Sequence, residues 1–321
     1  MRAVRRTEAG IEVVDVPAPL AGEGVRVRVR AVGICQTDVN LARLGPLPQT
    51  LGHEFAGELA DGTPVGVEPL VPCGACEPCR RGDYQWCERG FAMIAGIGFD
   101  GGMADEVVLP ARCLVALPRG LEARDACLIE PLAVNLHSLA LARFEPAQRV
   151  CVVGAGITGF GLLAAAAAKD RGARVDFEPA GDSGGGAMRD AACAAAAALG
   201  VGTAPEGAYD LVIEGDGDES SIARAVERCR PGATLLLVAG YYSDKTFPTV
   251  PCAMKELHMV WGTLYGHHAA GRAVESAAAL LARTPAIARA LVTHRMPLDA
   301  ARDAFALVES DAPSLKVVLE P

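Results

Sequence analysis

Residues 149–160 read RVCVVGAGITGF, and this stretch decides the fold of the chain. A compact apolar strand, 149–153, runs into a turn with the spacing G-x-G-x-x-G at Gly154, Gly156 and Gly159, and an apolar helix is expected to follow. Alone the glycine spacing is a weak signal, but between a strand and a helix it is typical of dinucleotide binding. Gly154 permits the tight turn, Gly156 lets the backbone approach a pyrophosphate, and Gly159 allows helix and strand to pack closely.

The same turn predicts where the rest of a dinucleotide would lie. Ile157 and Thr158 stand at the helix N-terminus, which faces the phosphates in such units. The second strand of the unit ends in an acid that binds the ribose hydroxyls, and we expect Glu178 there, with Asp176 as the alternative because the strand is short. Either carboxylate would repel a 2′-phosphate, which favours NAD without excluding NADP, and Arg174 nearby weakens that preference.

Working outward from the glycine turn, strands alternate with helices, which predicts a Rossmann-type, doubly wound parallel sheet over residues 133–265. The expected strands are 174–177, 210–214 and 233–238, and the expected helices are 160–169, 188–199 and 220–229. The part before it is rich in short strands, beginning with the alternating run GVRVRVRAV at 24–32, and suggests a barrel or a strongly bent sheet. We assign residues 1–132 and 266–321 to that second domain, since the tail, with a helix at 298–308 and a strand at 315–319, is expected to return to it.

Composition narrows the classes of function. The chain has 321 residues, a formal net charge of −9, 51% hydrophobic and 21% charged residues, as expected of a globular protein with a sizeable core. The negative charge argues against nucleic acid or an anionic membrane surface as the main partner. Residues 1–14 lack the apolar core of a signal peptide, and the longest apolar run, 162–168, is too short to cross a membrane. We therefore expect a cytoplasmic protein whose eleven cysteines stay reduced.

Four of those cysteines form a cluster within the lobe 73–89. The spacing is C-x2-C-x2-C-x7-C, formed by Cys73, Cys76, Cys79 and Cys87. The segment has too few apolar residues to fold without a cross-link. Four thiolates with no open position suit a tetrahedral structural zinc. An iron–sulfur cluster needs the same four ligands and competes on spacing alone.

A second site is scattered over three short segments. GICQTD at 33–38 ends a strand, GHE at 52–54 lies in a turn, and EPL at 130–132 lies at the boundary between the two domains. Each segment alone is a weak signal, because a single cysteine is usually buried as a small hydrophobe and a lone histidine is usually structural.

Together, the order of these segments resembles that of the zinc-dependent medium-chain alcohol dehydrogenase family. GICxTD, GHE, the four-cysteine lobe, EPLAV and the dinucleotide turn follow one another as in that family, and its polyol branch, which includes sorbitol dehydrogenase, is the most similar. The tail segments LVTHRMPLDAARDAF and SLKVVL are also similar to it. The resemblance covers the whole chain and implies a mainly β, GroES-like catalytic domain beside the nucleotide-binding domain.

The resemblance implies a catalytic zinc in addition to the structural one, so two zinc ions per chain. Cys35 and His53 match the family's catalytic zinc ligands. Glu54 matches a carboxylate that ligates the metal or lies just behind it, and Glu130 stands where polyol-type members carry glutamate. The choice between Glu54 and Glu130 as third ligand stays open at this point. A zinc with three protein ligands keeps a position for an alcohol oxygen and lowers the pKa of its hydroxyl, which eases the release of hydride.

Further roles are implied by the same resemblance. Thr37 matches the hydroxyl that accepts the substrate proton, Asp38 would orient His53, and Lys316 matches a basic residue that reaches the cofactor phosphates. The chain departs from the family at Asn40, where many relatives have a histidine that ends the proton relay; an amide cannot act as a base. The connection 60–67 is also shorter than is usual in the family.

We therefore predict a zinc-dependent oxidoreductase that transfers hydride between a secondary alcohol or polyol and NAD(H), acting as a homodimer or homotetramer on small molecules. Two alternatives remain. A zinc-free reductase of the same superfamily would act on quinones or enoyl groups with NADPH and would hold no second metal. A non-catalytic NAD(H)-binding redox sensor would use the four-cysteine lobe and would turn over no alcohol.

Overall fold

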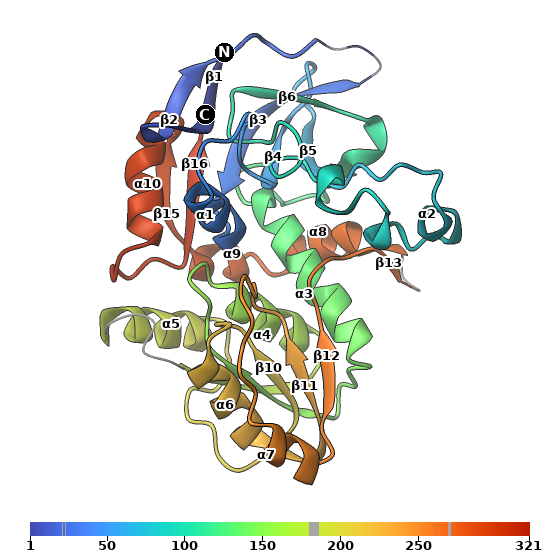
Figure 1. The fold of residues 1–321 in the computed structure, drawn as a ribbon, viewed down its shortest axis with the longest axis vertical. Helices are drawn as coiled ribbons and strands as arrows, with labels where there is room; N and C mark the ends of the chain where they lie inside the picture. The colour runs from blue at the N-terminus through green and yellow to red at the C-terminus, as the bar shows by residue number, and fades with distance from the viewer. Residues whose placement is uncertain (21, 23, 180–185, 269–270) are drawn as a thin grey trace.

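The computed structural model describes residues 1–20, 22, 24–179, 186–268 and 271–321. Two large β-sheets of different kinds organise them, one of five strands and one of seven. In Figure 1 the five-stranded sheet with its helices fills the lower half of the molecule, and the seven-stranded sheet lies in the upper half. Among the described residues there is no helix with the length and hydrophobicity that a membrane crossing requires.

The five-stranded sheet grows outward from the apolar strand before the glycine turn. Its order is β12-β11-β10-β8-β9, and every neighbouring pair is parallel. Its strands are β8 (Arg149–Val153), β9 (Arg174–Glu178), β10 (Tyr209–Glu214), β11 (Cys229–Leu237) and β12 (His258–Trp261), with helices α4 (Phe160–Asp170), α5 (Gly186–Ala198), α6 (Glu219–Arg228) and α7 (Thr249–Met254). Residues 150–153 of β8 are fully buried, because helices cover both faces of a parallel sheet. The predicted doubly wound α/β class is confirmed.

The order of this sheet reverses beside β8, because the chain crosses from β9 on one side of β8 to β10 on the other. The carboxyl ends of β8 and β10 therefore border a crevice, and open α/β sheets bind their ligands at such a switch point. The segment between α5 and β10 contributes a single parallel bridge, from Gly202 to Asp176, in place of a full further strand.

The seven-stranded sheet holds the N-terminal part and the tail together. Its order is β15-β16-β3-β4-β5-β7, with β6 paired to β3, and all pairs except β15–β16 are antiparallel. These strands are β3 (Val25–Gly33), β4 (Glu54–Glu58), β5 (Pro64–Val67), β6 (Glu106–Leu109), β7 (Leu114–Ala116), β15 (Val292–Pro297) and β16 (Lys316–Glu320), next to a hairpin of β1 (Arg2–Thr7) and β2 (Gly10–Asp15). β3 pairs with β6 at its start and with β16 at its end, and its register shifts between Val29 and Ala31, as a strongly bent sheet requires.

Helices fill the junction between the two sheets. α3 (Ile129–Leu141) is buried along most of its length and packs against α4 and α8. The remaining elements are α1 (Gln36–Arg43), α2 (Glu77–Arg81), η1 (Tyr84–Trp86), η2 (Gly90–Met93), η3 (Ala111–Cys113), η4 (Ala126–Leu128), β13 (His267–His268), β14 (Gly271–Arg272), α8 (Ala273–Arg283), α9 (Ala286–Leu291), η5 (Leu298–Ala300) and α10 (Ala301–Val308). Figure 1 shows α3 and α8 between the halves and the C-terminal elements β15, β16 and α10 beside the N-terminal strands.

A buried ion pair ties the cysteine-rich lobe to the junction. Glu68, which follows β5, is 5% exposed and accepts hydrogen bonds from Arg272 at the start of α8 and, at 2.6 Å, from the hydroxyl of Tyr84 in the lobe. The side chain of Arg272 is 19% exposed and that of Glu68 is 7% exposed, so water solvates the carboxylate poorly and the guanidinium compensates its charge.

Removing the arginine from this pair is expected to destabilise the fold. The Arg272→Ala variant leaves the Glu68 carboxylate buried without its cation, which we expect to lower the free energy of unfolding by about 3 kcal/mol in a chemical denaturation experiment. Arg81→Ala is the matched control, because its ion pairs to Glu77 and Asp83 are exposed, and it should change the stability by less than about 0.5 kcal/mol. Equal effects of the two substitutions would contradict this assignment.

Candidate active site and zinc-binding clusters

The end of β3 and the start of β4 bring three metal-ligating side chains together. Cys35 caps the N-terminus of α1 just after β3, while His53 and Glu54 stand at the start of β4, where Glu54 pairs with Gly33. One ligand atom from each of the three lies within 4.8 Å of the other two. A Cβ on Gly33 would lie 2.3 Å from a carboxylate oxygen of Glu54, so only glycine leaves room for that carboxylate. A thiol, an imidazole and a carboxylate are the donor set of a catalytic zinc.

Asp38 fixes the geometry of this cluster. Its buried carboxylate accepts hydrogen bonds from the backbone N–H of Cys35 at 2.9 Å and from that of Gly52 at 3.2 Å, and it lies 3.5 Å from Nδ1 of His53. Burial lowers the pKa of His53, but the charges of Asp38 and of the Cys35 thiolate outweigh it and hold that pKa well above its usual value. Asp38 therefore joins two of the three segments, 33–38 and 52–54, and lies beside the imidazole that the resemblance implied it would orient.

Glu54 has a second partner, Lys316 at the start of β16. The lysine Nζ donates to the two Glu54 oxygens at 2.7 and 3.0 Å and to the carbonyl of Ile34 at 3.3 Å. Both side chains are 1% exposed. The resemblance implied that Lys316 contacts the cofactor phosphates, but its ammonium group contacts the Glu54 carboxylate instead. The physical reason is that the buried Glu54 carboxylate needs a cation, and the pairing of β16 with β3 places Lys316 directly against it.

Glu130, in the first turn of α3, lies close to the same cluster without sharing its hydrogen bonds. Burial raises the pKa of its carboxyl to about 8, and the charges of His53 and Glu54 act on it in opposite directions. Within the described part of the chain the carboxyl group of Glu130 makes no hydrogen bond or ion pair. Its carboxylate does not belong to the group of atoms within 4.8 Å of one another. A half-buried carboxyl group without a hydrogen-bond partner is a suitable neighbour for a metal ion.

Thr37 lies at the mouth of the cluster. The thiol of Cys35 lies 3.6 Å from its hydroxyl, and the hydroxyl of Tyr242 lies 2.7 Å from it. Asn40, one helical turn on, donates from its side-chain amide to the carbonyl of Gln36 at 2.9 Å. The side-chain amide of Asn40 is thus hydrogen-bonded to the backbone of its own helix.

The four cysteines of the lobe also converge. Their sulfur atoms lie within 4.8 Å of one another, and those of Cys73 and Cys79 are 3.9 Å apart. Hydrogen bonds from the backbone N–H groups of Ala75 and Cys76 lower the pKa of the Cys73 thiol to about 6, whereas burial and the neighbouring thiols raise that of Cys79 to about 12. Amide hydrogen bonds to sulfur favour the thiolate, the form that binds metal.

The glycine turn borders a crevice of about 200 Å³ at the switch point of the parallel sheet. Ala155, Gly156 and Ile157 line one side, and the end of α1 and the segment after α10 line another. Thr158 is 3% exposed, and Gly154, Gly156 and Gly159 all have positive φ. A Cβ on Gly154 would lie 2.3 Å from the carboxylate of Asp216, so this turn has no space for a side chain.

Asp216 follows the end of β10 and enters this crevice. Its carboxylate accepts the backbone N–H of Gly156 at 2.6 Å. Burial raises the pKa of that carboxyl to about 7, more than the Gly156 hydrogen bond lowers it, and the charges of Glu214 and Asp218 add to the rise. The backbone N–H of Gly156, which could bind a phosphate, is therefore already hydrogen-bonded to the Asp216 carboxylate.

The two acids predicted for the ribose take different positions. Glu178 ends β9 beside the glycine turn, and its carbonyl accepts the N–H of Gly154 at 2.9 Å. Its carboxylate is held by Arg224 at 2.5 Å and Arg228 at 2.6 Å. The alternative, Asp176, is buried and accepts a hydrogen bond from the hydroxyl of Tyr209 at 3.0 Å, within the sheet.

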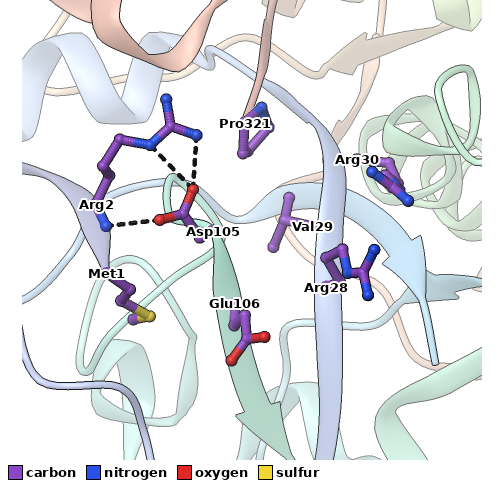
Figure 2. Close-up of a pocket in the computed structure, with 8 residues that line it drawn as sticks. All are labelled: Met1, Arg2, Arg28, Val29, Arg30, Asp105, Glu106 and Pro321. Carbon is purple, nitrogen blue, oxygen red and sulfur yellow. Dashed lines mark hydrogen bonds and ion pairs between the residues drawn. The ribbon is translucent and has the colours of Figure 1, made fainter. Parts of the chain in front are cut away.

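A second hollow, of about 440 Å³, lies away from these groups, between the N-terminal strand, β3, β6 and Pro321. Figure 2 shows the Arg2 side chain and backbone bonded to Asp105 at its rim, with Arg28 and Arg30 opposite. Arg30 in turn pairs with Glu58 at 2.6 Å. Because two of its three guanidiniums are already neutralised, this hollow is a poor site for an anion.

Two residues of the candidate site, Asp216 and Tyr242, were missed by the sequence reasoning. Asp216 carries a usable signal, since it follows the carboxyl end of a parallel strand next to β8. Tyr242 carries none, because its approach to Thr37 depends on how the two sheets sit relative to each other.

Comparison with known proteins places this geometry in a family. The alcohol dehydrogenase GroES-like domain matches residues 21–119. D-xylulose reductase A of Aspergillus oryzae is 31% identical over 290 residues, which cover 78% of each chain. A probable D-xylulose reductase A of Aspergillus fumigatus is 33% identical over 281 residues, or 75% of each chain.

Solved structures agree with this. Galactitol-1-phosphate dehydrogenase of Escherichia coli superposes with a TM-score of 0.84 at 26% identity and covers 100% of both chains. A zinc-binding dehydrogenase of Sinorhizobium meliloti, solved with NADP, gives a TM-score of 0.80 at 25% identity and covers 100% of this chain and 99% of its own.

The chain therefore belongs to the zinc-dependent medium-chain alcohol and polyol dehydrogenase family, with a GroES-like domain beside a Rossmann-type domain. It is an NAD(P)-dependent oxidoreductase of small-molecule alcohols or polyols, and its cofactors are zinc and a nicotinamide dinucleotide.

Proposed function

We propose that this enzyme oxidises a secondary alcohol or polyol with NAD at a zinc held by Cys35, His53 and Glu54. The observation that carries the proposal is the convergence of these three donors within 4.8 Å at the end of β3. The D-xylulose reductases among its relatives support a polyol and its ketone as the substrate pair. We also propose domain boundaries at residues 132/133 and 265/266. The pairing of the tail strand β16 with β3 supports this division.

Each residue of the cluster has one part in this chemistry. The zinc, when bound, lowers the pKa of the substrate hydroxyl so that hydride leaves its carbon more readily. Asp38 orients His53 through Nδ1 and leaves Nε2 for the metal. Thr37, next to Cys35, accepts the substrate's hydroxyl proton.

We propose Glu54 as the third ligand and Glu130 as a nearby carboxyl group outside the ligand set, mostly protonated at pH 7 because its pKa is about 8. Glu54 has an oxygen within 4.8 Å of the donor atoms of Cys35 and His53, and each of its oxygens has two lone pairs, so it can accept from Lys316 and bind zinc at once. Glu130→Gln alters a carboxyl group and keeps the ligand set, whereas Glu54→Gln removes a ligand. The zinc affinity should therefore fall further in Glu54→Gln.

We further propose that Cys73, Cys76, Cys79 and Cys87 hold a structural zinc, which gives two zinc ions per chain. Their convergence and the amide hydrogen bonds to Cys73 support this. Metal-binding thiols have to stay reduced, and for this reason we also propose the cytoplasm as the location of the enzyme.

Metal content per chain, measured by plasma mass spectrometry, tests the two sites separately. We expect two zinc ions in the native protein and one in Cys35→Ser, with the fold retained, because the lobe is independent of Cys35. Cys252→Ser, which alters a cysteine outside both clusters, should keep two.

Native protein with one zinc that stays at one in Cys35→Ser would contradict the catalytic site. Turnover that persists without that metal would favour a zinc-free reductase of the superfamily. Iron in place of zinc at the lobe would point to an iron–sulfur cluster.

The dinucleotide is proposed to bind across the crevice, with its pyrophosphate on the turn Gly154–Gly159, including the amides of Ile157 and Thr158, and its adenosine ribose near Glu178. The positive φ of the glycines and the crevice beside Asp216 support this placement. Glu178 favours NAD, while Arg224 and Arg228 neutralise part of its charge, so we expect a modest preference for NAD over NADP.

Asp216 should make cofactor binding depend on pH. Because its pKa is about 7, the carboxyl is neutral at pH 6 and ionised at pH 8.5, where it repels the pyrophosphate. In Asp216→Asn we expect the dissociation constant of NADH to fall about tenfold at pH 8.5 and to change less than about twofold at pH 6. Fluorescence titration at both pH values measures it, and an equal change at the two would contradict the assignment.

We propose a homodimer or homotetramer assembled through the outer edge of the parallel sheet. β12 ends the sheet, and apolar side chains on and beside it are exposed, among them Met259, Trp261, Val250 and Met254. An apolar edge strand of this kind invites pairing with another chain.

Light scattering should therefore give two or four times the chain mass of 33.2 kDa. Trp261→Glu should shift the mass toward the monomer, because it places a charge in the proposed contact. The control Trp86→Glu alters an exposed tryptophan in the lobe and should leave the mass unchanged. A native mass of 33.2 kDa would overturn the assembly.

A further inference from the structure

A hydrogen bond joins the two halves of the molecule at the candidate active site. The hydroxyl of Tyr242, in the segment after β11, lies 2.7 Å from that of Thr37 in α1, although 205 residues separate them. Either oxygen can be the donor. Two hydroxyls in this relation can exchange a proton in either direction, since each has one hydrogen and two lone pairs.

Asn40 offers no such path. Its amide group donates to the carbonyl of Gln36 within α1, and an amide neither gains nor loses a proton near neutral pH. A proton that arrives at Thr37 therefore needs another group to leave by.

Tyr242 is such a group. The residue is 49% exposed, and its bond to Thr37 lies on the solvent-accessible side of the site. Partial burial raises the pKa of its phenol to about 12, so the phenol keeps its proton at neutral pH. It can thus pass on one proton only as it receives another, as a hydroxyl relay does.

We propose that Tyr242 carries the substrate proton from Thr37 to solvent. The proposal rests on the proposed function, in which Thr37 accepts the proton of the alcohol.

The step balances as follows. The substrate O–H gives its proton to the Thr37 oxygen, the Thr37 hydrogen moves to the Tyr242 oxygen, and the Tyr242 hydrogen moves to water. The carbon–hydrogen bond breaks at the carbon that bears the substrate hydroxyl, and its two electrons leave with the hydride to the nicotinamide. The products are a ketone, the reduced cofactor and one proton in solvent.

The test uses the zinc-loaded enzyme with NAD and the best substrate from a panel of secondary alcohols and polyols that includes xylitol. Stopped-flow absorbance follows the first turnover, with cofactor reduction and proton release (a pH indicator) recorded together. In Tyr242→Phe we expect both rates to fall about 10- to 100-fold, because only the hydroxyl is lost. The solvent deuterium isotope effect should rise, since proton transfer then limits the rate, and added imidazole should restore part of the rate.

Tyr241→Phe is the matched control. It removes the neighbouring phenol of the same segment, whose hydroxyl bonds Glu214 in the parallel sheet and not Thr37. Its isotope effect should equal that of the native enzyme, and imidazole should not accelerate it. In the double variant Asn40→His with Tyr242→Phe, the imidazole on α1 should recover part of the lost rate.

Native rates and a native isotope effect in Tyr242→Phe would overturn the relay while leaving the proposed function intact. So would faster turnover with tighter NADH binding, since the phenol would then obstruct the cofactor instead of carrying a proton. A native enzyme that is inactive on the whole panel, although it holds two zinc ions and binds NADH, would overturn both proposals.

Discussion

The buried ion pair between Lys316 and Glu54 is the constraint on which the active site depends. The two residues are 262 positions apart, and neither charge could stay in its dry position without the other. The pair fixes β16 against β3 and holds the Glu54 carboxylate beside Cys35 and His53. The tail of the chain is thus part of the metal site, even though the sequence segments that carry the chemistry lie near its beginning.

A second carboxylate, Asp38, completes this arrangement from the other side. It accepts hydrogen bonds from the backbone N–H groups of Cys35 and Gly52. The segment after β3 and the segment before β4 are therefore held at a fixed distance before a metal ion binds. Such preorganisation matters for a zinc enzyme, since ligands that are already placed need little rearrangement on binding. The lobe is a separate unit, joined to the body through Tyr84, Glu68 and Arg272.

Local patterns predicted much of the fold. The strand 149–153 was predicted to the residue, and the run 24–32 became β3, one residue displaced. The hairpin of β1 and β2 and helix α8 were not predicted, because their apolar residues pack against distant elements and show no clear period. At the site, the close approach of Cys35, His53 and Glu54 followed from motif order, while the positions of Lys316, Asp216 and Tyr242 depend on tertiary packing that a single sequence does not display.

The pairing of β16 with β3 also sets an order of events during synthesis. The ribosome makes every strand of the parallel sheet before it makes β15 and β16, so the strands of the nucleotide-binding half can pair while the seven-stranded sheet still lacks two of its strands. Until β16 docks, Glu54 has no lysine beside it and the bent sheet has an open edge at β3. The metal site can therefore be completed only after all strands of the cofactor-binding sheet have been made.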